Sequence, residues 1–289
     1  MRRIAILLLI LTCVVAKGQR PFVAATWNVE NYFDTQHDSL KSDTAFLPSG
    51  EYRWTPARFA AKRNNIYKVI VDMGGDDFNV PALVALQEVE NDRVLRELCM
   101  NTPLRKLGYD YIHFESPDAR GVDCAVIYRK DRFAPFLSKP ICVSDTAAGF
   151  RTRDLLLVEG VMDGKDTVCL VVCHLPSKRG GAAADIRRLE VVRVLRHTLD
   201  TLQQNHPDAV VMAMGDFNAG MGEDALGKGL GLSDGVNPEG FYDLTYSMPN
   251  TMGSYKYQGR WDYIDHILIN RKCVGRVFAA DYLLKNEKG

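Results

Sequence analysis

The chain has 289 residues, of which 46% are hydrophobic and 25% are charged. These values exclude a disordered or low-complexity chain and allow one large globular domain or two small ones. With 36 basic and 36 acidic residues the formal net charge is zero, which argues against a protein that wraps nucleic acid nonspecifically through a basic surface.

The N-terminus has the pattern of a secretory signal. Residues 1–3 carry two arginines, residues 4–15 are almost all apolar, and residues 16–18 include the small residues that a signal peptidase reads. Such an apolar run is too short to span a bilayer comfortably, which favours a cleaved signal peptide over stable membrane insertion. We therefore expect residues 1–18 to be removed and the protein to be exported, either periplasmic or secreted. A lipoprotein anchor at Cys13 is a weaker alternative, because the residues before it are not small.

Beyond the signal, short apolar runs alternate with amphipathic stretches. Apolar runs bounded by turn residues predict strands at residues 22–27, 82–87, 111–114, 124–128, 155–161, 167–173, 209–214 and 263–269. Helical spacing of apolar residues predicts helices at residues 56–73, 93–100 and 182–204. The expected apolar stripe of the last helix consists of Ile186, Leu189, Val192, Leu195, Leu199 and Leu202. A turn-rich segment separates the strands at residues 124–128 and 155–161.

Several predicted strands follow one another without an intervening helix. This order favours two mixed sheets packed face to face with helices outside, a four-layer α-β-β-α sandwich of the α/β class, over a simple doubly wound parallel sheet. No linker rich in proline or serine and no internal repeat divides the chain, so residues 19–289 are expected to form one domain. We expect this domain to be a monomer.

Six cysteines remain after residue 18, and an even number in an exported protein permits disulfides. Cys169 and Cys173 lie in one predicted strand, about 13 Å apart along it, which is too far for a bond between them. No CxxC pair occurs, which argues against a zinc site. We therefore expect buried free thiols.

Four predicted strands are followed by polar residues that can carry chemistry. These residues are Asn28, Glu88, His174, and Asp216 together with Asn218. Each has a structural explanation when taken alone: Asn28 could cap a turn, Glu88 could open the next helix, and a single histidine after a strand is usually structural. Four such strand ends are harder to explain by capping, because side chains at strand ends meet at the rim of a sheet, where catalytic groups are commonly placed.

This set of groups suits hydrolysis of a phosphate ester. The Glu88 carboxylate offers a hard oxygen ligand to Mg²⁺ or Mn²⁺. On an extended segment Asp216 and Asn218 would face the same side, so that one could orient a water molecule while the other donates to a phosphate oxygen. His174 could donate a proton or a charged hydrogen bond to the phosphate.

The ordered set of motifs resembles the endonuclease/exonuclease/phosphatase superfamily, and in particular its deoxyribonuclease-like members. The motifs are Thr26-Trp27-Asn28, Leu86-Gln87-Glu88, the strand end at His174, Gly215-Asp216-Phe217-Asn218 and Tyr263-Ile264-Asp265. The resemblance covers residues 22–269. The segments at residues 120–123 and 174–181 are similar to a bacterial exported subgroup that is usually labelled endonuclease-like.

The resemblance implies a role for each site residue. Glu88 is the implied main metal ligand, and Asn28 is implied to help hold the metal and the phosphate. His174 is implied to bind the phosphate. Arg153 matches an arginine that faces the phosphate or holds the structure, although a solvated charge would explain it nearly as well.

The remaining roles concern the nucleophile. Asp216 and Asn218 are implied to position it and to stabilise the transition state, and Asp265 is implied to orient a catalytic histidine. That histidine belongs to a Ser-Asp-His triplet beyond the Asp265 position, and no histidine follows His266 in this chain. Because neighbouring strand residues face opposite sides, His266 is not expected to enter the site unless a local bulge turns it inward. We therefore expect that a closing strand and its general base are missing from the C-terminus.

The sequence thus predicts an exported phosphodiester hydrolase that depends on Mg²⁺ or Mn²⁺ and acts as an endonuclease on nucleic acid. Two alternatives stay open. One is a phosphodiesterase or phosphatase acting on lipid headgroups or small phosphate esters. The other is a non-catalytic binding protein that keeps the site but lacks the general base.

Overall fold

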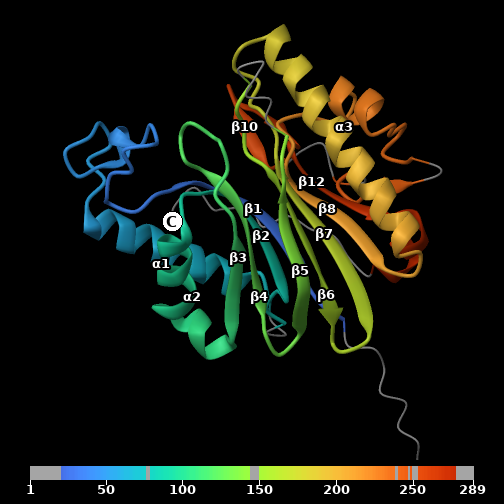
Figure 1. The fold of residues 1–289 in the computed structure, drawn as a ribbon, viewed down its shortest axis with the longest axis horizontal. Helices are drawn as coiled ribbons and strands as arrows, with labels where there is room; N and C mark the ends of the chain where they lie inside the picture. Colours follow the sequence, from blue (N-terminus) through green and yellow to red (C-terminus); the bar gives the residue numbers. More distant parts are fainter. Residues whose placement is uncertain are drawn as a thin grey trace, which may run out of the picture.

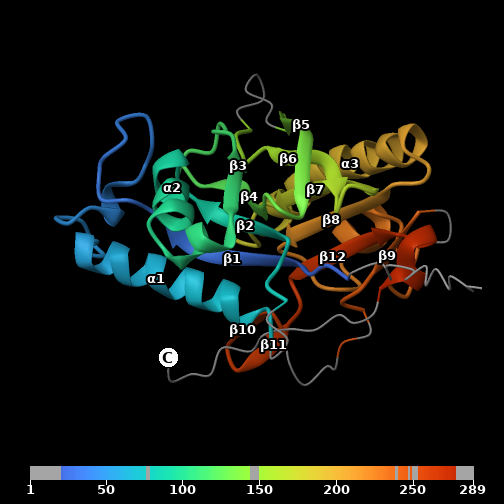
Figure 2. The same ribbon diagram turned by 90° about the horizontal axis from the view of Figure 1, so that it is seen from below.

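Two β-sheets lie face to face, with helices on both outer sides (Figures 1 and 2). A computed structural model describes residues 21–75, 79–143, 150–237, 240–246, 248 and 253–277. The arrangement confirms the predicted four-layer sandwich. The expected signal peptide at residues 1–18 and the end of the chain at residues 278–289 lie outside the described residues.

The smaller sheet has four strands in the order β1-β2-β4-β3. It consists of β1 (Ala24–Tyr32), β2 (Leu83–Val89), β4 (Asp123–Arg129) and β3 (Tyr109–His113). β1 and β2 are parallel, and the other neighbours are antiparallel. Every predicted strand in this part of the chain is present, with shifted ends.

Two helices, α1 (Pro56–Asp72) and α2 (Asp92–Met100), cover the outer face of this sheet. Both begin at capping residues, since the side chain of Thr55 accepts a hydrogen bond from the Arg58 N–H and that of Asn91 accepts one from the Val94 N–H. The caps explain why both predicted helices start within a residue of the expected position.

The larger sheet has six strands in the order β5-β6-β7-β8-β12-β9. They are β5 (Phe133–Ile141), β6 (Leu155–Met162), β7 (Asp166–His174), β8 (Val210–Asp216), β12 (Asp265–Asn270) and β9 (Phe241–Asp243). α3 (Ala182–Asn205) packs on its outer face. The short hairpin of β10 (Tyr255–Tyr257) and β11 (Arg260–Asp262) lies below β1 and β12 in the view of Figure 2. The described residues also contain four short helical segments: η1 (Thr44–Phe46), η2 (Pro103–Leu107), η3 (Ala225–Gly229) and η4 (Arg271–Arg276).

Side chains of the central strands point alternately into two apolar layers, one between the two sheets and one between a sheet and its outer helix. In β7, Leu170 and Val172 pack between the sheets, while Cys169 and Val171 pack under α3. A strand covered on both faces must be apolar along its whole length, which is why this one was predictable as a continuous apolar run. The same alternation directs His174 toward the inner side of the sheet.

Two expectations differ from the structure. The turn-rich segment contains β5, an edge strand in which Pro135 and Pro140 interrupt the strand pattern and most side chains are at least partly exposed. In α3, Ile186 is 59% exposed although it was placed in the apolar stripe. Ala184 and Arg188 form the buried face at that end of the helix instead.

Five of the six described cysteines are buried free thiols, as expected, and Cys142 is exposed. Within the described residues, no helix is both long enough and apolar enough to cross a membrane.

Candidate active site

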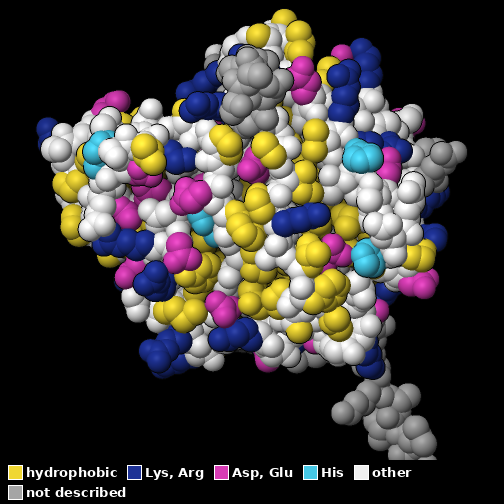
Figure 3. Space-filling view, viewed as in Figure 1, with side chains coloured by type: hydrophobic (Ala, Val, Ile, Leu, Met, Phe, Trp, Pro, Cys, Tyr) yellow, Lys and Arg dark blue, Asp and Glu magenta, His cyan; other side chains and the backbone are white. Residues whose placement is uncertain are grey.

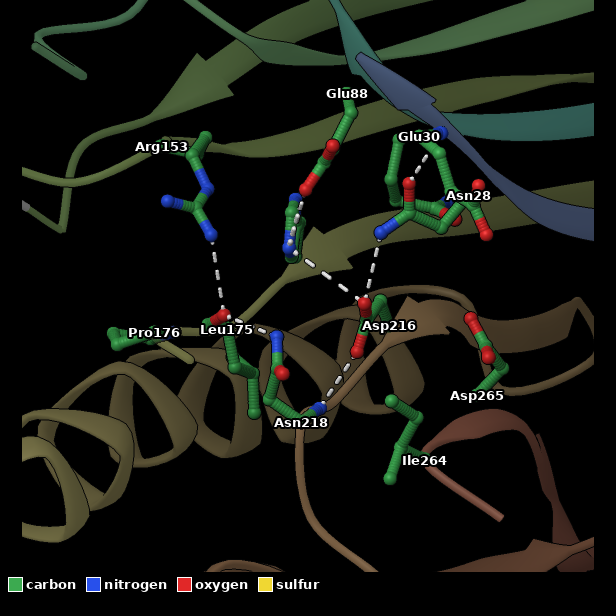
Figure 4. Close-up of polar contacts among 12 residues, drawn as sticks. Asn28, Glu30, Glu88, Arg153, Leu175, Pro176, Asp216, Asn218, Ile264 and Asp265 are labelled. Carbon is green, nitrogen blue, oxygen red and sulfur yellow. Dashed lines mark hydrogen bonds and ion pairs between the residues drawn. The ribbon is translucent and has the colours of Figure 1, made fainter. Parts of the chain in front are cut away.

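Strand register brings three predicted residues to one edge of the larger sheet. In the parallel pair of β7 and β8, His174 lies opposite Asp216. In the antiparallel pair of β8 and β12, Asp265 lies opposite Asp216. The three side chains therefore come from neighbouring strands at the same end of the sheet, and Figure 4 shows Asp216 and Asp265 side by side.

The smaller sheet contributes Asn28 from β1 and Glu88 from β2 (Figure 4). The Asn28 side-chain amide donates a hydrogen bond of 2.9 Å to Asp216 Oδ2. His174 Nε2 lies 3.9 Å from Glu88 Oε1 and 3.7 Å from Asp216 Oδ2. The structure thus brings the predicted residues of both sheets together around one imidazole.

Asn28 does not stand at a strand end, contrary to the expectation from the sequence, whereas Glu88 stands one residue before the end of β2. β1 and β2 continue past them, and the strand pairing is irregular at both positions. Glu88, Glu30 and Asn31 have positive φ values of 61°, 57° and 64°. Such conformations are costly for residues with side chains, and a local irregularity redirects the side chain beside it. The strain therefore marks the place where the smaller sheet meets the site.

Asp216 and Asn218 are brought together by a turn and not by an extended segment. The Asn218 N–H donates to Asp216 Oδ1 at 2.8 Å, and Asn218 has a φ of 47°. Just before them, Gly215 has a φ of 151°, and a Cβ there would lie 1.9 Å from the carbonyl oxygen of Cys173. Only glycine permits this close approach of β8 to β7, which fixes the height of Asp216 beside His174.

His174 is held as a neutral imidazole. Burial lowers its pKa well below the usual range, and the nearby charges of Arg153 and Arg120 lower it further. The sequence allowed a charged hydrogen bond from His174, but the lowered pKa favours the neutral imidazole. Since Nε2 faces two carboxylates, the proton is best placed on Nε2, which leaves His174 able to donate a neutral hydrogen bond into the site.

The pKa values of the buried carboxylates are raised, whereas that of His174 is lowered. Burial raises the pKa of Asp216, although hydrogen bonds from Asn28 and Asn218 oppose this effect. Burial and the adjacent charge of Asp216 raise the pKa of Asp265 to about 7. Negative charge on both groups is unfavourable unless a cation lies nearby.

Arg153 is buried and is not a solvated charge. Its Nη1 donates to Asp118 Oδ2 at 2.9 Å and its Nη2 donates to the Leu175 carbonyl at 3.3 Å, which holds the segment after β7 in place. Its role in binding phosphate stays a prediction. No role was predicted for Arg120, whose Nη2 lies 3.5 Å from Glu88 Oε1. Its position before a glycine in a turn was the available signal.

His266 lies outside the site. Its ring is fully buried, with Nδ1 2.7 Å from Asp243 Oδ2 and Nε2 2.9 Å from the Ala219 carbonyl. The alternative that a bulge turns it inward beside Asp265 is therefore wrong. Within the part of the chain that the structure describes, His174 is the one histidine that lines the cleft.

The site opens into a long cleft that runs along β1 of the smaller sheet and β12 of the larger one. Exposed basic side chains of Arg120, Lys178, Arg179 and Arg260 line it, together with Trp261 of β11. Lys178 also contacts Glu223 at 2.6 Å and Asp262 at 3.3 Å. On the face shown in Figure 3, basic and acidic side chains are interspersed and form no large basic patch.

An α-β-β-α sandwich with carboxylate, carboxamide and imidazole groups gathered at one end defines a phosphoesterase. The sequence model of the Endonuclease/Exonuclease/phosphatase family matches residues 23–287, so the chain belongs to that family. Its members typically use divalent metal ions. A search of curated protein sequences finds no match.

Several solved structures share the fold at low sequence identity. The human Nocturnin catalytic domain with bound sulfate is 18% identical, with a TM-score of 0.51, and the match covers 71% of this chain and 74% of that one. D. rerio TDP2 complexed with single-strand DNA product is 22% identical, with a TM-score of 0.50 and coverage of 73% and 77%. A mannosyl-6-phosphatase of Bacteroides thetaiotaomicron is 15% identical, with a TM-score of 0.53 and coverage of 87% and 86%.

The residues present fit a divalent cation. Glu88 and Asn28 offer hard oxygen atoms of the kind that Mg²⁺ and Mn²⁺ prefer. The Asn28 carbonyl oxygen is oriented by the Glu30 N–H at 2.9 Å and keeps a second lone pair. The raised pKa values of Asp216 and Asp265 show a surplus of buried negative charge that a cation would relieve.

Proposed function

We propose that this chain is an exported hydrolase of phosphodiester bonds in nucleic acid that depends on Mg²⁺ or Mn²⁺. The observation that carries the proposal is the position of His174 Nε2, 3.9 Å from Glu88 and 3.7 Å from Asp216 at the bottom of the cleft. A neutral hydrogen-bond donor between two carboxylates suits a site that must bind a phosphate and orient a water molecule beside it.

The side chains of the site have different roles. Glu88 and Asn28 would hold the metal, which when bound would neutralise charge on the phosphate oxygens. His174 donates its Nε2–H to a phosphate oxygen, and Asn218 has a second amide N–H beyond the one it donates to Leu175. Asp216 is held by Asn28 and by the Asn218 N–H, so its carboxylate can accept a hydrogen bond from the attacking water in a fixed direction. Asp265 lies opposite Asp216 in the strand register, and no described histidine besides His174 lines the cleft for it to orient.

The form of the cleft supports nucleic acid as the substrate. Exposed basic side chains follow its rim, and Trp261 is 41% exposed beside it. Such grooves bind single strands through backbone phosphates and through bases stacked on aromatic rings. The fold match to TDP2 with a single-strand DNA product is consistent with this proposal.

A small phosphate ester or a lipid headgroup is the second candidate. The formal net charge of zero supplies little long-range attraction for a polyanion. The fold match to a mannosyl-6-phosphatase is consistent with a small ester. A binding protein without activity remains the third reading, to be separated by the same experiment.

The test is an activity panel on the purified chain. Plasmid DNA, single-stranded DNA, RNA, sphingomyelin, mannose 6-phosphate and p-nitrophenyl phosphate are each incubated with Mg²⁺, with Mn²⁺ and with EDTA. We expect cleavage of nucleic acid that EDTA abolishes and that Asp216→Asn lowers strongly, while Glu190→Gln, an exposed change on α3, has no effect. Hydrolysis of the small esters alone would assign the second candidate. Binding without hydrolysis of any substrate would assign the third.

A further inference from the structure

Three potential metal ligands meet outside the cleft, beneath the C-terminal end of α3. Glu159 of β6 and Cys169 of β7 lie directly opposite each other in the antiparallel pair, so their side chains share the face that α3 covers. His206 follows α3, and its N–H donates to the Leu202 carbonyl at 2.8 Å, which fixes the start of its side chain. None of the three lines the cleft or has a part in the proposed hydrolysis.

The ligand atoms converge. His206 Nε2 lies 3.0 Å from Glu159 Oε2, and Cys169 Sγ lies 3.6 Å from the same oxygen. All three ligand atoms lie within 4.8 Å of one another. Tetrahedral zinc with ordinary bond lengths holds sulfur, nitrogen and oxygen ligands about 3.3–3.6 Å apart. The two separations from Glu159 Oε2, 3.0 Å and 3.6 Å, differ from that arrangement by at most a few tenths of an ångström, and the third pair, Cys169 Sγ and His206 Nε2, lies within 4.8 Å, so rotation of the His206 side chain can complete it.

We propose that Glu159, Cys169 and His206 form a binding site for one Zn²⁺ ion. A thiolate, a carboxylate and a neutral imidazole would balance the charge of the ion at a place where Glu159 is 6% exposed and Cys169 is fully buried. The His206 side chain is 36% exposed, which leaves a path for the ion and room for water as the fourth ligand. The ion would tie the two strands to the end of α3.

Binding would displace a proton, because zinc is held by the thiolate and not by the thiol of Cys169, and that proton passes to solvent. Burial and the charge of Glu159 raise the pKa of the Cys169 thiol to about 12. Zinc affinity should therefore increase with pH. Without metal, His206 Nε2 and Glu159 Oε2 form a polar contact of 3.0 Å beside a thiol, and that is the alternative that the experiment must separate.

The sequence argument against zinc rested on the absence of a CxxC pair. The ligands of this cluster come from two strands and from the residue that follows a helix, so no local motif shows them. Strand register and the end of α3 bring them together only in the folded chain.

The experiment uses Co²⁺ as a spectroscopic probe and Zn²⁺ as its competitor, with the full chain. Cobalt bound to a thiolate gives a charge-transfer absorption in the near ultraviolet that oxygen and nitrogen ligands do not give, so this signal excludes the Glu88 site. We expect the absorption in the wild-type chain and in Glu88→Gln, and its loss on addition of one equivalent of Zn²⁺. Cys169→Ser and His206→Ala should lose it, whereas Cys99→Ala and His197→Ala should keep it.

The affinity for Zn²⁺ provides the second readout. Loss of an outer-shell partner of a metal ligand already weakens binding about 10–100-fold, so loss of a direct ligand should weaken it at least as much. His206 is partly exposed, so His206→Ala should fold even if Cys169→Ser does not. No charge-transfer absorption in the wild-type chain, or an absorption that persists in His206→Ala at unchanged affinity, would overturn the proposal.

Discussion

Glu88 and Asp216 face the same nitrogen of His174, but their surroundings differ. Glu88 touches the exposed side chain of Arg120, whereas Asp216 is fixed by hydrogen bonds from Asn28 and from the Asn218 N–H. We therefore expect Glu88→Gln to raise the metal concentration needed for half-maximal activity. Asp216→Asn should instead lower kcat by about 10²–10⁴-fold, because it removes a group that acts in the transition state. Steady-state rates across a Mg²⁺ titration measure both effects.

Glu190→Gln on the outer side of α3 is the matched control for a lost carboxylate. Activity close to that of the wild type in both site variants would contradict the roles assigned to Glu88 and Asp216. An equal loss of kcat in both, with no change in metal dependence, would contradict the division between them.

The sequence predicted which residues lie at the site better than it predicted the backbone geometry that places them there. His174 and Asp216 were predictable because each ends a continuous apolar strand. The positions of the Asn28 and Glu88 side chains depend on irregular strand pairing and on nearby residues with left-handed backbone. No residue type in those segments predicts these features. Arg120 was missed because its contact with Glu88 joins residues far apart in the chain.

At the scale of elements, those with a local signal in the sequence were predictable and those without one were not. Buried strands and capped helices were predictable, since apolar runs and capping residues are local signals. β5 was not, because an exposed edge strand with two prolines lacks the apolar pattern. The three-residue strands β9, β10 and β11 are too short to show any periodicity.

The β10–β11 hairpin is expected to bind the substrate beyond the scissile phosphate. Trp261 is 41% exposed beside the cleft, and Lys256 Nζ lies 5.2 Å from the centre of its ring. Stacking of one base on an aromatic side chain contributes about 1–3 kcal/mol, so Trp261→Ala should raise KM for single-stranded DNA roughly 5–150-fold. Hydrolysis of p-nitrophenyl phosphate should not change. Phe136→Ala, at an exposed aromatic residue of β5 away from the cleft, should affect neither substrate. Equal losses on both substrates would show that Trp261 supports the fold and not the substrate.

His266 connects β12 to β9 and contributes stability that depends on pH. Burial lowers the pKa of His266, but the adjacent Asp243 carboxylate and the hydrogen bonds to Asp243 and Ala219 raise it by more. The pKa of folded His266 is therefore above the ordinary value of 6.5. A raised folded-state pKa gives stability that is fully present below pH 6.5 and is lost as the pH rises through the folded pKa. His266→Gln should therefore cost most at low pH, on the order of 3–5 kcal/mol for breaking a buried pair, and less at high pH.

Urea unfolding of both proteins at several pH values measures this difference. His197→Gln, an exposed change on α3, should show no such trend. A destabilisation by His266→Gln that grows with pH would contradict the raised pKa.

At the scale of the whole molecule, neutral charge limits how the chain can hold a polyanion. The exposed basic residues that line the cleft are Arg120, Lys178, Arg179, Lys256, Arg260 and Arg276; Lys178 is paired with Glu223 and Asp262, and Arg276 is paired with Asp166. Each phosphate neutralised on a single strand contributes about 0.7 to the slope of log affinity against log salt concentration. Three or four contacts therefore predict a slope of about −2 to −3 for single-stranded DNA.

Fluorescence anisotropy of labelled single-stranded DNA measures that slope, with the Asp216→Asn variant in EDTA so that no cleavage occurs. Arg179→Ala should make the slope shallower by about 0.7, whereas Arg193→Ala, at an exposed arginine of α3, should leave it unchanged. A slope steeper than about −5 would mean that many more cations contact the strand than line this cleft, and the binding surface would then have to lie elsewhere. A slope near zero, with binding retained, would mean that aromatic contacts alone hold the strand.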